Sequence, residues 1–297
     1  MRTILFFTIS YFINSLMLFG QEHFSNDPLD AKFVVSDYNN FWKAFDQLED
    51  TTTNPFEAYI ENASLGLRPY VPYLTAEEVY HTVKARKGDY LKSRHVLDNL
   101  DIEKKRVQGI YAAMKYWYPQ AVFPPIYFVV GVFSSGGTVS ENGLLIGVEL
   151  LENLENLDGL IAHELIHYQQ QVQGTNTLLK QVLKEGSADF IGELTSGVLL
   201  NKKLPEYGEA HEEELCKEFV QVMHGKDFGD WLYQKPKNEN QPKDMGYWMG
   251  YKIVEAYFHK QENKRKAIDA ILHIKDPEVF LHQSGYLEKY NKKGSKN

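Results

Sequence analysis

The sequence has almost no cysteine: Cys216 is the single one among 297 residues. A lone cysteine cannot form a disulfide within the chain, so no disulfide framework can hold this fold together. Stability must come from a hydrophobic core. The hydrophobic share of 43% is enough, at this length, for one large domain or two small, closely packed ones. We interpret Cys216 as a small buried side chain rather than a catalytic thiol.

The sequence also has fewer basic residues than acidic ones. The 32 lysines and arginines are outnumbered by 40 aspartates and glutamates, which gives a formal net charge of −8. The basic residues are scattered apart from short clusters such as Lys104–Arg106, which we interpret as solvated surface. A nucleic-acid-binding protein concentrates its basic residues on one face, so we expect no nucleic-acid partner.

Beyond its first twenty residues the sequence has no long hydrophobic run. Residues 1–20 contain one early positive charge and an apolar stretch that ends at Gly20, which is typical of a cleaved secretory signal peptide. The alternative is a membrane anchor, but the run is short for a bilayer span and is interrupted by polar residues. We therefore expect an exported protein, periplasmic or extracellular, that keeps no stable membrane span after cleavage.

Helical patterns occupy much of the remaining chain. Asp37 is placed to cap a helix that carries aromatic residues at core spacing. The capping sequence Thr75–Glu78 predicts a second helix that ends near Arg86. A third helix is expected over residues 98–117, because a proline follows at position 119.

Strand patterns are confined to one region. Residues 126–133 and 143–148 are rich in β-branched and aromatic side chains, and the turn signal Ser134–Gly137 lies between them. We interpret the two segments as strands, with an antiparallel pairing as the expectation. The pattern after Leu150 is helical nearly to the end, so the fold class is α+β and helix-dominated, with a small sheet.

Residues 157–173 carry the clearest functional signal. Apolar residues recur there at helical spacing, and Gly174 offers a stop. His163 and His167 lie one helical turn apart, so both imidazoles can bind one metal ion. Glu164 lies about 100° around the helix from His163 and about 60° from His167, on the same side. H-E-x-x-H on a helix is typical of zinc metallopeptidases, with the glutamate as general base.

A third ligand is expected downstream, because catalytic zinc keeps three protein ligands and one open position. Glu185 and Asp189 are four apart on a predicted helix and share a face. We predict Glu185 as the third zinc ligand and Asp189 as the hydrogen-bond acceptor of a ligand histidine. Glu193 could compete with Glu185 but has no acid four residues on. Gly186 would let the two helices approach closely.

When water attacks a peptide bond, negative charge develops on the carbonyl oxygen, and a hydrogen-bond donor usually stabilises it. The candidates for this donor are tyrosines near position 250. Tyr247 and Tyr251 are four apart, and Gly250 on that face permits close packing. We predict Tyr247, near the helix start, as the donor, with His224 as the alternative. Both tyrosines could equally be core aromatics.

The two segments together resemble the gluzincin arrangement, H-E-x-x-H with a later E-x-x-x-D. The chain also resembles a group of bacterial Zn-dependent proteases related to the gliding-motility lipoprotein GldB. The matching stretches are Asn40–Asp46, Gly136–Val139, Gly143–Gly147, His163–His167, Glu185–Asp189 and Gly246–Ile253. This resemblance implies a single zincin-like metallopeptidase domain over residues 21–297, with Zn²⁺ as cofactor. The sequence lacks the lipobox cysteine of GldB.

These observations predict a secreted zinc metallopeptidase that acts on peptides or proteins. The competing interpretation is a non-catalytic zinc-binding envelope protein, related to gliding-motility proteins, that binds a partner. Structural zinc sites are mostly closed and built from cysteine and histidine, so two histidines and one glutamate favour catalysis.

Overall fold

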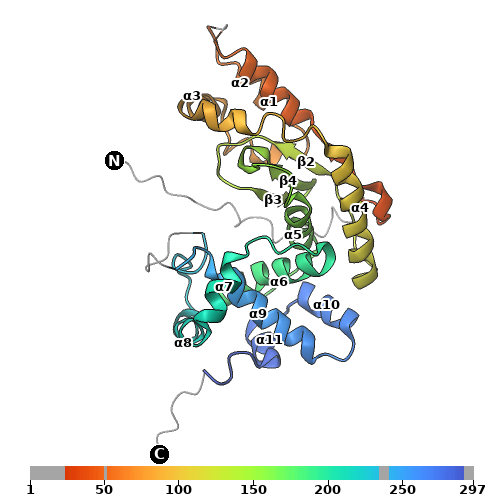
Figure 1. The fold of residues 1–297 in the computed structure, drawn as a ribbon, viewed down its shortest axis with the longest axis vertical. Helices are drawn as coiled ribbons and strands as arrows, with labels where there is room; N and C mark the ends of the chain where they lie inside the picture. Colours follow the sequence, from red (N-terminus) through yellow and green to blue (C-terminus); the bar gives the residue numbers. More distant parts are fainter. Residues whose placement is uncertain (1–23, 50–51, 234–240, 291–297) are drawn as a thin grey trace, which may run out of the picture. The chain divides into compact units, whose positions relative to one another are not determined.

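The computed structural model describes residues 24–49, 52–233 and 241–290 (Figure 1). The expected signal peptide over residues 1–20 lies outside them. The described chain falls into two compact units that meet in sequence at Tyr168 and Gln169. None of the helices among the described residues combines the length and the apolar character of a membrane-spanning segment.

The N-terminal unit combines helices with one sheet (Figure 1). Its helices are α1 (Ser36–Asp46), α2 (Phe56–Glu61), α3 (Ala76–Lys92), α4 (Leu100–Trp117) and α5 (Leu157–Gln169), whose last residue opens the second unit. Its 3₁₀ turns are η2 (Pro28–Asp30), η3 (Arg68–Tyr70) and η4 (Val148–Leu150). Its strands are β1 (Phe33–Val34), β2 (Ile126–Val129), β3 (Gly137–Ser140) and β4 (Gly143–Gly147).

The sheet has the order β1-β2-β4-β3. Every residue of β2 and β4 is buried, which fits the apolar runs that predicted these strands. The two are neighbours, as expected, but they run parallel and not antiparallel. The antiparallel partner of β4 is β3, joined to it by a two-residue turn. The expectation failed because β3 was not recognised: its first residue, Gly137, was assigned to the turn, and residues 138–140 were assigned to no element.

Aromatic side chains of α1 pack the core of this unit. Phe41 is fully buried and lies against the rings of Phe56, Tyr59 and Tyr90. Asp37 does not cap the helix as predicted. It is buried in the first turn, where its carboxylate accepts hydrogen bonds from the Ser64 amide at 2.9 Å and hydroxyl at 2.5 Å, and burial raises its pKa.

The other predicted helices form close to their expected bounds. Thr75 caps α3 by accepting from the Glu78 amide at 3.2 Å. The helix continues to Lys92, but its backbone leaves helical geometry at Arg86, where the sequence had placed its end. The predicted helix over 98–117 is α4.

The described residues of the C-terminal unit form helices and connecting turns, with no strand among them. The helices are α6 (Leu178–Ser196), α7 (Lys203–Ala210), α8 (Glu212–Val222), α9 (Met245–Lys260), α10 (Lys264–Leu272) and α11 (Pro277–Ser284). Cys216 in α8 is fully buried, as expected, and burial raises the pKa of its thiol to about 11.

Helices α6 and α9 touch through their backbones (Figure 1). A Cβ atom built on Gly186 would lie 2.0 Å from the Gly250 carbonyl carbon, and one on Gly250 would lie 1.9 Å from the Val182 oxygen. Only glycine allows this approach. Gly186 does permit a close helix contact, but its partner is α9 and not the H-E-x-x-H helix that the sequence had predicted.

We predict that Gly186→Ala destabilises the fold by about 1–3 kcal/mol, because the added methyl group collides with backbone that cannot rotate away. Urea unfolding measures the change. The control is Gly109→Ala in α4, an exposed position with no atom within 4 Å of the new Cβ. It should be stabilising by about 0.5–1 kcal/mol. Similar effects of the two substitutions would contradict the packing argument.

Candidate metal centre

Helix α5 holds the two predicted histidine ligands against one another. The Nε2 atoms of His163 and His167 lie 2.9 Å apart, and their rings are nearly perpendicular at 86°. Two nitrogens bound to one tetrahedral zinc at about 2.0–2.1 Å would lie about 3.3 Å apart. The two nitrogens therefore converge on one point, and they lie about 0.4 Å closer together than two nitrogens bound to one zinc ion would.

Helix α5 is buried, so each polar side chain on it lowers the stability of the fold unless it has a partner. Leu157, Ile161 and Leu165 are fully buried, as the apolar spacing predicted. His163 and Glu164 are nevertheless only 6% and 5% exposed. Buried polar groups cost free energy unless they are paired, so both side chains need partners inside the protein.

The general-base candidate lies against the edge of the sheet. A Cβ atom on Gly137, the first residue of β3, would lie 2.4 Å from Oε1 of Glu164. The strand can therefore approach the carboxylate only because residue 137 has no side chain. Tyr70 also lies nearby: burial raises the pKa of its phenol, and the charge of Glu164 raises it further. The small sheet expected beside the H-E-x-x-H helix is thus in place.

The third ligand candidate, Glu185, lies in α6 and is only 5% exposed. Its Oε1 accepts a hydrogen bond from the Tyr233 hydroxyl at 2.7 Å. Asp189 follows one helical turn later, on the face the spacing predicted.

Tyr233 is a site residue that the sequence reasoning missed. Burial raises the pKa of its phenol, and the charge of Glu185 raises it further, so the group stays protonated and donates. It has a positive φ of 67°, and its amide donates to the Asp244 carboxylate at 2.7 Å. No motif surrounds it, so only the tertiary contact with Glu185 reveals it.

Among the residues that the structure describes, one group of three His, Cys, Asp or Glu side chains could hold a metal ion. It consists of His163, His167 and Glu185, whose ligand atoms all lie within 4.8 Å of one another. These are the residues whose spacing predicted a zinc site. Two imidazoles and one carboxylate suit zinc and leave a coordination position open.

The oxyanion-donor candidates differ in their surroundings. Tyr247 is half-buried in α9, and its pKa is raised well above the usual value by burial first and then by the charge of Glu185. Tyr251 donates to Glu193 Oε2 at 2.8 Å, so these two residues are engaged with one another. His224, the alternative, lies in an exposed pair with Glu278.

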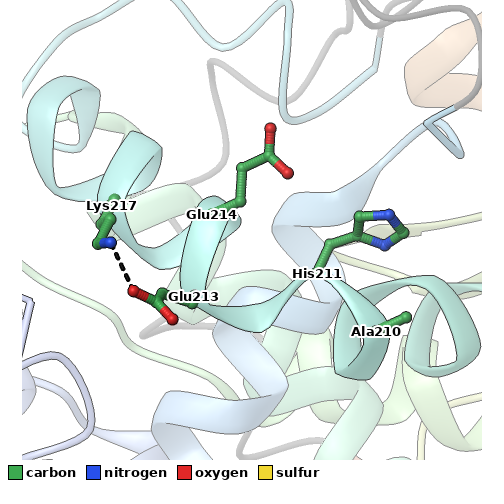
Figure 2. A pocket seen from close by; sticks show the side chains of 5 residues that line it. All are labelled: Ala210, His211, Glu213, Glu214 and Lys217. Carbon is green, nitrogen blue, oxygen red and sulfur yellow. Dashed lines mark hydrogen bonds and ion pairs between the residues drawn. The ribbon is translucent and has the colours of Figure 1, made fainter.

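A separate hollow on the C-terminal unit carries no comparable chemistry. It is lined by Ala210, His211, Glu213, Glu214 and Lys217 (Figure 2). The His211 ring stacks on Tyr207 at 4.0 Å, and Lys217 pairs with Glu213 at 2.5 Å. None of the motif residues lines it, and the ion pair of Lys217 with Glu213 is exposed, so it contributes little to stability.

A buried H-E-x-x-H helix and a His-His-Glu group are the arrangement expected of a zinc-dependent protease. Residues 131–277 match the family described as "Predicted Zn-dependent protease (DUF2268)". This part of the chain therefore carries that family's sequence, and the expectation of a zinc-dependent protease is confirmed at the level of the family. No curated protein matches the chain. No solved structure matches it either. The relation to GldB stays an expectation.

We predict about one zinc ion per chain in the purified protein, measured by atomic emission. The double variant His163→Ala, His167→Ala should lose it, because two of three ligands are gone. The control is His81→Ala, His95→Ala, which removes two side chains that are 68% and 77% exposed. Equal zinc content in both double variants would contradict the assignment.

Proposed function

We propose that the protein is an exported zinc metallopeptidase that hydrolyses peptide bonds with Glu164 as the general base. The observation that carries the proposal is the convergence of the His163 and His167 Nε2 atoms at 2.9 Å beside the buried Glu164 carboxylate. The family match over residues 131–277 supports the same chemistry.

His163, His167 and Glu185 would hold the zinc ion. Zinc in such a site supplies Lewis acidity, which polarises a carbonyl group and lowers the pKa of water towards about 7. Tyr233 would orient Glu185, since a hydroxyl 2.7 Å from the carboxylate fixes its rotamer. Asp189 would accept the far ring N–H of a ligand histidine, so the nitrogen facing the metal stays unprotonated.

Glu164 would take a proton from the attacking water and deliver it to the leaving amine. It follows His163 on α5, and its carboxylate lies against the first residue of β3, so a water and a peptide held there would both be within its hydrogen-bond reach. Tyr247 would donate a hydrogen bond to the carbonyl oxygen as negative charge develops on it.

An extended peptide or an unfolded protein segment is the proposed substrate. Strand β3 lies at the edge of the sheet, and its first residue touches Glu164. A peptide that adds to this edge as a further strand would bring its backbone to the general base. This arrangement recognises main chain rather than particular side chains.

The proposed location is the periplasm or the cell exterior, with the mature chain beginning near Gln21. The proposal derives from the composition of residues 1–20, and the resemblance to GldB-related proteins is compatible with it. A non-catalytic partner-binding protein of the cell envelope would have the same location, so activity must distinguish the two.

We predict that Glu164→Gln keeps zinc and fold but loses hydrolysis, because the amide preserves shape and cannot accept the proton. Cleavage of a broad peptide library, with zinc content and melting temperature measured in parallel, tests it. A variant as fast as wild type would mean that Glu164 is not the base. A library that neither protein cleaves would favour the partner-binding alternative.

A second pair of variants tests the same base without altering it. Gly137→Ala should push Glu164 aside and lower kcat, whereas Gly136→Ala has no atom within 4 Å of its new Cβ and should leave kcat unchanged. Equal activity of the two would show that the contact between β3 and Glu164 does not matter for catalysis.

We predict that Tyr247→Phe lowers kcat by roughly 10²–10³, the usual effect of losing one oxyanion donor, with zinc content unchanged. Tyr251→Phe, one helical turn further on, is the control, because that hydroxyl is bonded to Glu193. Wild-type kcat in Tyr247→Phe would remove Tyr247 from the mechanism and make His224→Ala the next variant to measure.

A further inference from the structure

The backbone of β3 alternates between facing its partner strand and facing outward. The Gly147 amide donates to the Gly136 carbonyl at 2.9 Å, and Gly137 pairs in register with Ile146. Residues of an antiparallel ladder point both their N–H and C=O groups to one side, in alternation. Gly137 and Val139 therefore direct their N–H and C=O groups away from β4, where an added strand would bind.

Both of these outward carbonyls already accept a hydrogen bond. The Ser135 hydroxyl donates to the Gly137 oxygen at 2.5 Å, and the Tyr70 hydroxyl donates to the Val139 oxygen at 2.6 Å. The amides of Gly137 and Val139 make no hydrogen bond within the described residues. The outer edge of β3 therefore has two amide donors available to a peptide, whereas both of its carbonyl acceptors are already hydrogen-bonded.

The two hydroxyls differ in how firmly they are placed. Ser135 is a short, exposed side chain two residues from its acceptor, so it can rotate away. Tyr70 comes from a distant segment that is itself fixed. Within that segment Gly66 packs on the Tyr127 ring, where a Cβ would lie 2.3 Å away, and the Leu65 carbonyl accepts from Asn142 at 3.0 Å.

Tyr70 also blocks the edge in space. A strand paired with Val139 would place its amide nitrogen about 2.9 Å from the Val139 oxygen, along the outward direction of that carbonyl. The Tyr70 oxygen already lies 2.6 Å from the Val139 oxygen, so an added strand would have to displace it or share this acceptor with it. An extended peptide can therefore pair at Gly137, beside Glu164, but cannot continue past Val139.

We propose that Tyr70 is a specificity-determining residue that ends the substrate-binding edge at Val139. The inference rests on the proposed function and adds a substrate class. The substrate lies along β3, and one side of its scissile bond runs in the direction from Gly137 to Val139. On that side the preferred peptides have few residues. Residues beyond that limit leave the edge and contribute no main-chain hydrogen bonds.

Peptide hydroxamates test the limit without turnover. Two series are bound to the zinc-loaded full chain, one extending towards the N-terminus from the hydroxamate and one towards the C-terminus, each lengthened by one residue at a time. We expect one series to stop gaining affinity at a short length in wild type. In Tyr70→Ala the same series should keep gaining about 2- to 10-fold per residue that adds a backbone hydrogen bond.

Two further variants isolate the cause. Tyr73→Ala removes an exposed tyrosine from the same segment and should keep the wild-type limit. Tyr70→Phe removes only the hydroxyl and should relax the limit in part. Melting temperatures identify any variant that fails to fold. Amide hydrogen exchange gives a second reading: the longest peptide should protect Gly137 alone in wild type, and both Gly137 and Val139 in Tyr70→Ala.

The outcomes separate the two proposals. If hydroxamates bind but the length profile of Tyr70→Ala equals that of wild type, Tyr70 does not set the limit and the proposed function stands. If affinity in wild type rises steadily in both series, Tyr70 moves aside and the inference is wrong. If no hydroxamate binds to zinc-loaded wild type, the open metal site is wrong, and the inference falls with it.

Discussion

The contact between Glu164 and Gly137 is the constraint on which the N-terminal unit depends. A carboxylate that is only 5% exposed must stay close to the groups it serves, because burial without partners would cost free energy. The edge strand can lie against it only where the chain has no side chain. Strand β3 is therefore fixed in register by β4 on one side and in position by Glu164 on its face. The proposed reaction and the proposed limit on substrate length both use this strand.

The C-terminal unit also contains a buried carboxylate that needs a hydrogen-bond partner. Glu185 is as buried as Glu164, and the Tyr233 hydroxyl supplies its partner. The backbone of Tyr233 is in turn bonded to Asp244, directly before α9, and α9 lies against α6 through Gly186 and Gly250. Holding one carboxylate in place therefore involves two helices and the turn that leads into the second. A protein that needed only stability could bury apolar residues there instead.

The helices that matter for the site were predictable because their signals are local. The two histidines four apart, the apolar face of α5 and the capping box of α3 each depend on residues within a few turns. The errors concern pairing and partners. β2 and β4 were recognised as strands, but their relative direction depends on β3. That strand has a weak pattern because it begins with Gly137, follows Gly136 and ends with Ser140. Asp37 was predicted to cap a helix, whereas its carboxylate accepts hydrogen bonds from Ser64, which is distant in sequence.

The sequence by itself determined the chemistry. Its single cysteine and net negative charge exclude other classes, and H-E-x-x-H followed by E-x-x-x-D predicts a zinc-dependent protease. These motifs are informative because the spacing of ligands on a helix fixes which side chains share a face. Only the tertiary structure decided which groups surround these residues. Tyr233 beside Glu185, Gly137 against Glu164 and Tyr70 on the Val139 carbonyl join residues that are 48, 27 and 69 positions apart. No local pattern encodes such contacts, because they arise when separate elements pack together and not from the preferences of either segment alone.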